Sequence, residues 1–137
     1  MSLREAARLI CHRRYDWLAH MDLKLKDKVV VVTGGAKGIG AESARAFASE
    51  GARVVIAGRS PAEGQTLADK TGGIFIEAEL SAEADCRRVV EETLSSLGRI
   101  DILINNAGYN DGVTLDDPPE KFMGSLQSNL SHVFTLT

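Results

Sequence analysis

Short runs of β-branched residues alternate along the chain with longer segments whose hydrophobic residues recur at helical spacing. The runs that predict strands cover residues 28–33, 53–57, 74–78 and 100–105. The first run, KVVVVT, has no polar alternation, which is typical of a strand buried on both faces of a parallel sheet. In the third run, Glu77 places one charge within the expected strand.

Four helices are predicted between and after these strands. They are expected over residues 39–50, from Ser60 to about residue 72, from Ser81 to Leu97, and from Asp117 to the end of the chain. Ser60 and Ser81 are the expected N-caps, because a serine hydroxyl can accept from a free amide of the first turn. Gly51 and Gly98 follow two of the helices and act as stop signals.

This alternation of strands and helices predicts the fold class. Strands linked by helices of a dozen or so residues form right-handed crossovers and a parallel sheet. We therefore expect an α/β fold, the N-terminal half of a Rossmann-type doubly wound sheet with strand order 3-2-1-4.

Composition and charge exclude several classes of protein. The formal net charge of −3 argues against a nucleic-acid partner, which needs a concentrated positive field. The apolar runs are far shorter than the roughly 18 residues that span a bilayer, so no membrane association is expected. Cys11 and Cys86 cannot form a disulfide framework, and no Cys/His cluster predicts a metal site, so a cytoplasmic location is expected.

Residues 1–21 differ from the rest of the chain. They carry a net charge of +2, whereas the remaining 116 residues carry −5. One interpretation is that Met21 is the natural start and that residues 1–20 are an extension outside the fold. The alternative is an appended amphipathic helix that docks on a partner. In both cases the folded domain is expected over residues 22–137.

A glycine-rich turn follows the first predicted strand. Gly34, Gly38 and Gly40 have the spacing TGxxxGxG, and Ser43 stands where the stricter GxGxxG pattern has its last glycine. A glycine turn at a helix N-terminus suits a pyrophosphate, because backbone amides can approach the anion closely. The turn therefore predicts a nucleotide site.

The residues after the second strand predict which nucleotide binds. An NAD site has an acidic residue about 20 positions past the glycines, which accepts from the ribose 2′-hydroxyl. This chain has Arg59 there, and an arginine can bind a 2′-phosphate through two parallel N–H bonds. With Lys37 as a second cation, NADP(H) is expected rather than NAD(H). The absence of the acid also disfavours a methyltransferase.

Three motifs resemble those of the short-chain dehydrogenase/reductase family, in the family's order and spacing. Residues 33–40, TGGAKGIG, resemble its cofactor turn, and residues 105–108, NNAG, resemble the motif after its fourth strand. Asn129, 23 residues beyond Asn106, resembles its catalytic asparagine. The resemblance covers residues 23–137 and implies hydride transfer between NADP(H) and an alcohol or carbonyl.

The resemblance also implies the roles of individual residues. Asn106 is expected along the cofactor ribose, and Glu79 and Leu80 against the adenine, although the family usually has Asp at position 79. The expected cofactor-binding residues are Thr33, Gly34, Lys37, Gly38, Ile39, Gly40, Arg59, Glu79, Leu80, Asn106, Ala107 and Gly108, and the expected catalytic residue is Asn129. Residues 109–112 further resemble sugar-type members such as L-fucose dehydrogenases.

Part of the family's catalytic set is missing from these 137 residues. The family uses a Tyr as proton donor, with a Lys four residues later and a Ser that holds the substrate oxygen. The only tyrosines are Tyr15 and Tyr109, and Ala19 and Val113 stand at the positions of that Lys. We therefore expect the N-terminal half of a longer dehydrogenase, truncated at its C-terminus and inactive alone. The alternative is a non-catalytic NADP(H)-binding or interaction module.

The last predicted helix indicates further properties. Phe122, Leu126, Leu130 and Phe134 form a hydrophobic stripe, which favours a homo-oligomer. His132 is expected to be a packed or exposed histidine rather than a catalyst. The remaining expected partners are the nicotinamide cofactor and a small alcohol, carbonyl or sugar substrate.

Overall fold

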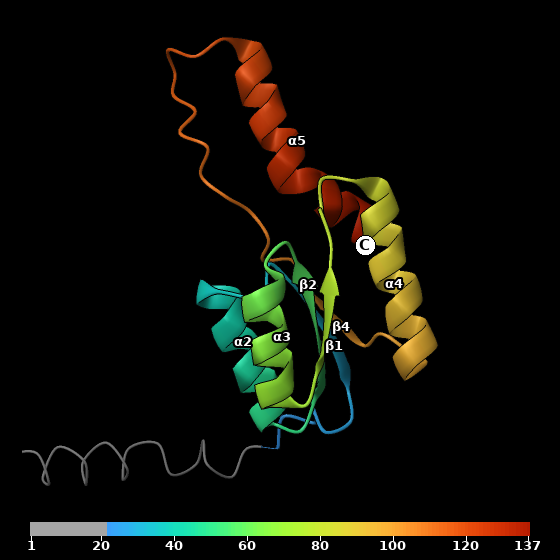
Figure 1. Cartoon of the computed structure of the whole chain (residues 1–137). Helices are drawn as coiled ribbons and strands as arrows, with labels where there is room; N and C mark the ends of the chain where they lie inside the picture. The colour runs from blue at the N-terminus through green and yellow to red at the C-terminus, as the bar shows by residue number, and fades with distance from the viewer. Residues whose placement is uncertain (1–21) are drawn as a thin grey trace, which may run out of the picture.

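A computed structural model describes residues 22–137, and the predicted N-terminal extension lies outside the described residues. Figure 1 shows the elements in chain order. They are β1 (Val29–Thr33), α2 (Gly38–Ser49), β2 (Arg53–Gly58), α3 (Pro61–Thr71), β3 (Ile74–Glu77), α4 (Glu83–Leu97), β4 (Ile102–Ile104) and α5 (Pro119–Leu136). The alternation of strands and helices is the predicted one.

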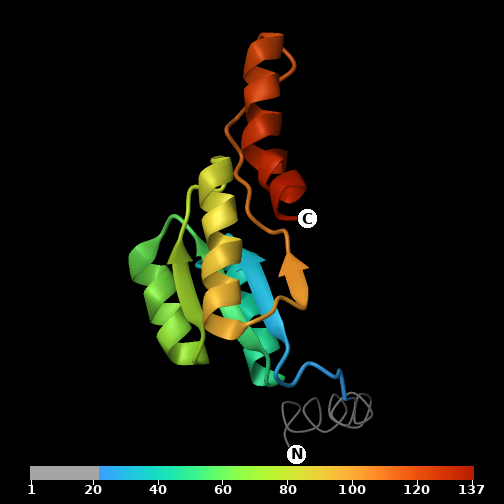
Figure 2. The same cartoon turned by 90° about the vertical axis from the view of Figure 1, so that its right-hand side faces the viewer.

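The four strands form one parallel sheet in the order β3-β2-β1-β4, which confirms the predicted order 3-2-1-4. Helices α2 and α3 cover one face of the sheet and α4 covers the other (Figures 1 and 2). Every residue of β1 is buried, as expected for a strand covered on both sides. The hydrophobic run therefore reflects burial on two faces.

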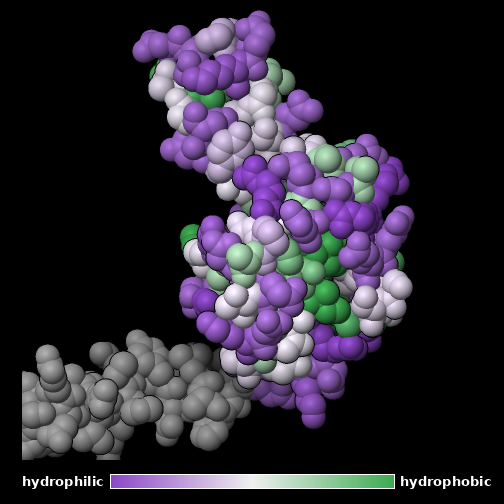
Figure 3. Space-filling view, viewed as in Figure 1, coloured by the Kyte–Doolittle hydropathy of each residue, from purple (hydrophilic) through white to green (hydrophobic). Residues whose placement is uncertain are grey.

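Alternate residues of the central strands form two hydrophobic cores. Val30 and Val32 point toward α2 and α3, where they pack with Ala44 and Leu67. Val31 and its neighbours on β2 and β3 point the other way and pack against Cys86 and Val89 of α4. Edge strand β3 is less covered, and Figure 3 shows hydrophobic surface on the body between α3 and α4, where β3 lies.

The ends of several elements differ from the predictions. Strand β4 is limited to Ile102–Ile104, shorter than the predicted residues 100–105. Helix α4 begins at Glu83 with Ala82 at its N-cap, so the prediction that Ser81 caps it is wrong. The Ser81 hydroxyl instead donates to the Glu79 carboxylate at 2.9 Å, which leaves it unable to serve α4.

The start of the last helix was also predicted incorrectly, whereas the predicted N-cap position of α3 is confirmed. Helix α5 begins at Pro119, not at Asp117, because the Asp117 carboxylate accepts from the Thr114 amide at 2.7 Å and closes a turn before the helix. Ser60 does precede Pro61 at the start of α3, but its hydroxyl makes no capping hydrogen bond.

Helix α5 extends beyond the body that the sheet and the other helices form. Residues 105–118, which contain neither helix nor strand, lead to its start, and α5 then returns so that its C-terminal end lies beside α4 (Figures 1 and 2). Phe122, Met123, Leu130 and Phe134 remain exposed on it. Within residues 22–137, no helix combines the length and the apolar character that crossing a membrane would require.

The carboxylate of Asp101 fixes the start of β1 against the segment before β4. It accepts from the Val29 amide at 2.9 Å and from Lys28 Nζ at 3.3 Å, while the Asp101 amide donates to the Val29 carbonyl. The bond from the Val29 amide is the main reason that the pKa of Asp101 lies below its usual value.

This lowered pKa predicts an acid-sensitive contribution to stability. The contribution is complete above the unfolded-state pKa of about 3.9 and is lost as the pH falls toward the lower folded-state pKa. We expect Asp101→Asn to be less stable than the wild type near neutral pH, with a smaller further loss between about pH 5 and 3. Urea unfolding at several pH values measures both effects.

Asp69→Asn is the matched control, because Asp69 is exposed on α3 and, among residues 22–137, its carboxylate accepts from Gln65 alone. It should leave the stability and its pH dependence close to those of the wild type. An Asp101→Asn protein that loses stability with acid as steeply as the wild type would contradict the assignment.

Candidate functional site

A cleft of about 480 Å³ lies at the carboxyl ends of the strands. Ten of the twelve predicted cofactor-binding residues line it: Gly34, Lys37, Gly38, Ile39, Arg59, Glu79, Leu80, Asn106, Ala107 and Gly108. Thr33 and Gly40 lie outside this lining. Ligands of open α/β sheets bind at this end, so the place agrees with a nucleotide site.

Thr33 lies beneath the cleft and joins two of its walls. Its buried hydroxyl donates to the Ile104 carbonyl at 3.1 Å and accepts from the amides of Asn106 and Ala107, each at 3.0 Å. One side chain thus satisfies three backbone groups at the end of β4. This contact holds residues 106–108 beside the glycine turn.

We call the contact between Thr33 and residues 104–107 the Thr33 joint. The Asn106 side chain adds two hydrogen bonds to this joint. Its Nδ2 donates to the Thr33 carbonyl at 3.0 Å and to the Gly34 carbonyl at 3.2 Å. A Cβ at Gly40 would lie 2.4 Å from this nitrogen, so only glycine fits there. Gly34 has a positive φ of 63°, which glycine adopts readily. The glycines therefore serve the packing of this joint, and Asn106 braces the turn in addition to lining the cleft.

The N-terminus of α2 opens into the cleft. Lys37 occupies the N-cap position in an extended conformation, and no side chain caps the first-turn amides. The side chain of Ile39, in that first turn, is 81% exposed. Free amides and the positive end of the helix dipole make this place suitable for an anion such as a pyrophosphate.

Both predicted phosphate-binding cations are paired with carboxylates. Lys37 Nζ lies 2.7 Å from Glu63 Oε1 on α3, and Arg59 Nη1 lies 3.4 Å from Glu79 Oε2. The hydrogen bond from Lys37 lowers the pKa of Glu63. The Arg59 guanidinium also lies over the Tyr109 ring, 5.7 Å from its centroid. All of these side chains are partly exposed, so the pairs can open at little cost.

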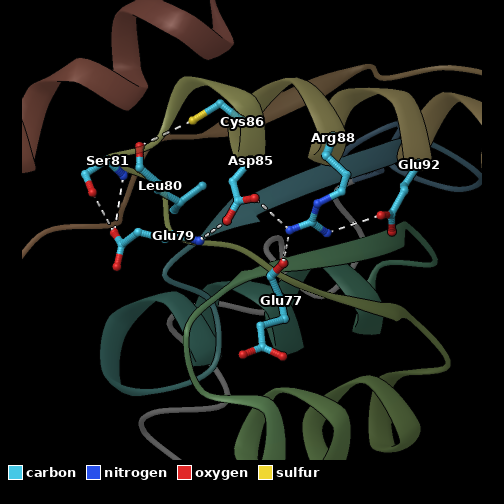
Figure 4. Close-up of polar contacts among 8 residues, drawn as sticks. All are labelled: Glu77, Glu79, Leu80, Ser81, Asp85, Cys86, Arg88 and Glu92. Carbon is cyan, nitrogen blue, oxygen red and sulfur yellow. Dashed lines mark hydrogen bonds and ion pairs between the residues drawn. The ribbon is translucent and has the colours of Figure 1, made fainter.

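A polar network holds the segment after β3, which forms another wall of the cleft (Figure 4). The Glu79 amide donates to the Asp85 carboxylate at 2.7 Å, and the thiol of Cys86 donates to the Leu80 carbonyl at 3.3 Å. Arg88 bonds Asp85 and also the Glu77 carbonyl, at 2.7 Å. The Ser81 hydroxyl is the main reason that the pKa of Glu79 lies below its usual value.

Asn129, the predicted catalytic residue, lies outside the lining of the cleft. Its Oδ1 accepts from the Tyr109 amide at 2.7 Å, and its Nδ2 donates to the Ser125 carbonyl at 3.0 Å. The side chain therefore anchors the loop after residues 105–108 to α5. Tyr109 itself lines the cleft and is half exposed, while Tyr15 falls among the residues that the structure does not describe.

Two residues of α5 line the cleft although sequence reasoning gave them no role there. Ser128 and His132 are four positions apart and therefore share one face of the helix. His132 was expected to be either packed or exposed. It is 1% exposed, so it is packed. Across residues 22–137, no three His, Cys, Asp or Glu side chains gather where they could hold a metal ion.

Comparisons with known proteins agree with this architecture. A family model described as short chain dehydrogenase matches residues 28–137. The chain is 42% identical over 93 residues to Short-chain dehydrogenase reductase ATA1 of Arabidopsis thaliana, which covers 68% of this chain and 34% of that protein. It is 41% identical over 112 residues to L-fucose dehydrogenase of Mus musculus, which covers 80% of this chain and 41% of that protein.

Solved structures give the same result. A 3-ketoacyl-(acyl-carrier-protein) reductase from Brucella melitensis, complexed with NADH, superposes with a TM-score of 0.74 at 36% identity. The match covers 82% of this chain and 48% of that one. The chain therefore spans less than half the length of these relatives.

The Thr33 joint predicts a specific cost of losing one hydroxyl. Thr33→Val keeps the shape of the side chain but leaves two amides and one carbonyl without their partner. We expect the free energy of unfolding to fall by about 2–4 kcal/mol, because buried polar groups that lose a partner are costly. Chemical denaturation measures this loss.

Thr33→Ser keeps the hydroxyl and removes one methyl, so it should lose only about 1 kcal/mol. The assignment would be contradicted if Thr33→Val were as stable as Thr33→Ser.

Proposed function

This chain belongs to the short-chain dehydrogenase family, and on that premise we propose that its cleft binds NADP(H) in preference to NAD(H). The observation that carries the proposal is the gathering of ten predicted cofactor residues around one cleft at the N-terminus of α2. The glycine turn would hold the pyrophosphate, and residues 79–80 and 106–108 would hold the adenosine half. Thr33 and Gly40 would act from below by shaping the turn.

The preference for a 2′-phosphate rests on Arg59 and Lys37. Binding a phosphate requires their pairs with Glu79 and Glu63 to open, and an exposed pair contributes only about 0–1 kcal/mol. A charge-assisted hydrogen bond to a phosphate contributes about 1.5–3 kcal/mol. The exchange therefore favours the phosphate, and the acidic residue that an NAD site uses is absent at position 59.

The reaction proposed for the whole protein is hydride transfer between the nicotinamide and an alcohol or carbonyl. Asn129 would support the site by holding the Tyr109 loop in place. A sugar substrate is a candidate, since L-fucose dehydrogenases are among the relatives. These 137 residues contain no Tyr-x-x-x-Lys, so we propose that they form the cofactor-binding portion and do not reduce a carbonyl alone.

The phosphate assignment is tested by a charge change at both cations. Arg59→Asp combined with Lys37→Ser should weaken NADP(H) binding about 10- to 100-fold, from the loss of one or two charge-assisted bonds. The Kd for NAD(H) should change little, because NAD(H) has no 2′-phosphate. Isothermal titration with both dinucleotides measures the ratio.

Arg45→Asp combined with Lys70→Ser is the matched control, because it makes the same change in net charge on α2 and α3 away from the cleft. It should leave the ratio of the two Kd values unchanged. Equal losses for both dinucleotides in the Arg59 and Lys37 variant would overturn the assignment.

We also propose that α5 mediates self-association. Phe134 is 91% exposed, and Phe122, Met123 and Leu130 are more than half exposed on the same helix. Several large hydrophobic side chains exposed on one helix favour contact with another protein surface. Light scattering should give the chain a mass above that of one copy, and Met123→Lys with Phe134→Lys should lower it. A wild-type chain that is monomeric at high concentration would contradict this proposal.

A further inference from the structure

Arg59 contacts two side chains of the cleft. Its Nη1 donates to Glu79 Oε2 at 3.4 Å, and its guanidinium lies over the Tyr109 ring, 5.7 Å from the centroid. All three residues line the cleft, and the side chains of Arg59 and Tyr109 are half exposed or more. A ligand in the cleft can therefore reach both of these side chains.

The contact with Tyr109 crosses the end of the central strand. Arg59 follows β2 and Tyr109 comes after β4, and β1 lies between these two strands in the sheet. Neighbouring strands are about 4.8 Å apart, so the contact spans about 10 Å across the carboxyl end of β1. The glycine turn follows β1 at that place. The ring therefore keeps the guanidinium over the part of the cleft that suits an anion.

The backbone that carries the Tyr109 ring is anchored to α5. The Tyr109 amide donates to Asn129 Oδ1 at 2.7 Å, and Asn129 Nδ2 donates to the Ser125 carbonyl at 3.0 Å. A Cβ at Gly108 would lie 3.0 Å from the same Oδ1, so a glycine allows this close approach. The ring is thus a fixed partner for a long and flexible arginine side chain.

An aromatic ring and a carboxylate occupy different parts of a guanidinium. Arg59 has five N–H donors, and among residues 22–137 only Nη1 has an acceptor. Glu79 uses such a donor and competes with a phosphate, whereas a ring attracts the cation through its face and leaves the N–H groups available. Tyr109 can therefore stay in contact when a phosphate replaces Glu79. A side chain that is already in place loses less freedom when its ligand binds.

We propose that Tyr109 is a positioning residue for the 2′-phosphate, whose ring holds Arg59 over the glycine turn and increases the preference for NADP(H) over NAD(H). This inference rests on the proposed function, because it assumes that Arg59 binds the phosphate. It gives a role to a residue that lies outside the predicted set of cofactor-binding residues.

The test is the ratio of the Kd for NADH to the Kd for NADPH, measured by isothermal titration. Tyr109→Leu removes the ring and should lower this ratio about two- to fivefold, the effect of one exposed cation–π contact. Tyr109→Phe keeps the ring and should keep the wild-type ratio. A substitution that only distorts the cleft would weaken both dinucleotides and leave the ratio unchanged.

Arg59→Ala completes a double-mutant cycle with Tyr109→Leu. Because this variant has no guanidinium, Tyr109→Leu should have no further effect on the ratio in that background. A measurement on the wild-type chain is independent of folding in the variants. In NMR spectra, the Arg59 side-chain protons should show an upfield ring-current shift from Tyr109 and keep it when NADPH is added.

Several outcomes would overturn the inference and leave the proposed function intact. They are a wild-type ratio in Tyr109→Leu, an equal fall in Tyr109→Phe, a further fall in the Arg59→Ala background, and a ring-current shift that disappears with NADPH. If the wild-type chain bound NADPH no more tightly than NADH, the proposed function would fail, and this inference with it.

Discussion

The hydroxyl of Thr33 is the contact on which the arrangement of the cleft depends. It lies where β1 ends and satisfies three backbone groups of a segment more than 70 residues away. Without it, two amides and one carbonyl at the end of β4 would be unpaired in a buried place, which is unfavourable. Because Asn106 then bonds back to the carbonyls of Thr33 and Gly34, the glycine turn and residues 106–108 form one unit. The cleft is the space above that unit.

The fold could be predicted because its signals are local. A buried β-branched run such as residues 28–33 has few alternatives to a central parallel strand, and the handedness of crossovers leaves few strand orders. The glycines were predictable for a related reason, since the close approach at Gly40 and the positive φ at Gly34 admit almost no other residue. Where one residue type is physically required, a single sequence is enough.

The interactions that sequence reasoning missed depend on competition between distant groups. Ser81 has a good capping side chain, but the Glu79 carboxylate takes its hydroxyl, so α4 starts later than predicted. The resemblance predicts a catalytic role for Asn129, but sequence reasoning did not predict that its side-chain oxygen accepts from the Tyr109 amide. The burial of His132 depends on how α5 packs beside α4, and helical spacing alone does not fix that rotation. No pattern in the sequence shows which of several possible partners a side chain will contact in the fold.

The two ends of the cleft differ in their exposure to water, and this difference has consequences for any nucleotide bound there. Arg59 and Lys37 are paired with carboxylates that are about half exposed. A phosphate can therefore take the place of each carboxylate, which then stays hydrated. Salt and water weaken interactions at that end. His132, at the other end, is 1% exposed, and burial lowers the pKa of its ring. Charged contacts at the exposed end therefore depend on salt and water, whereas the end at His132 is closed to both.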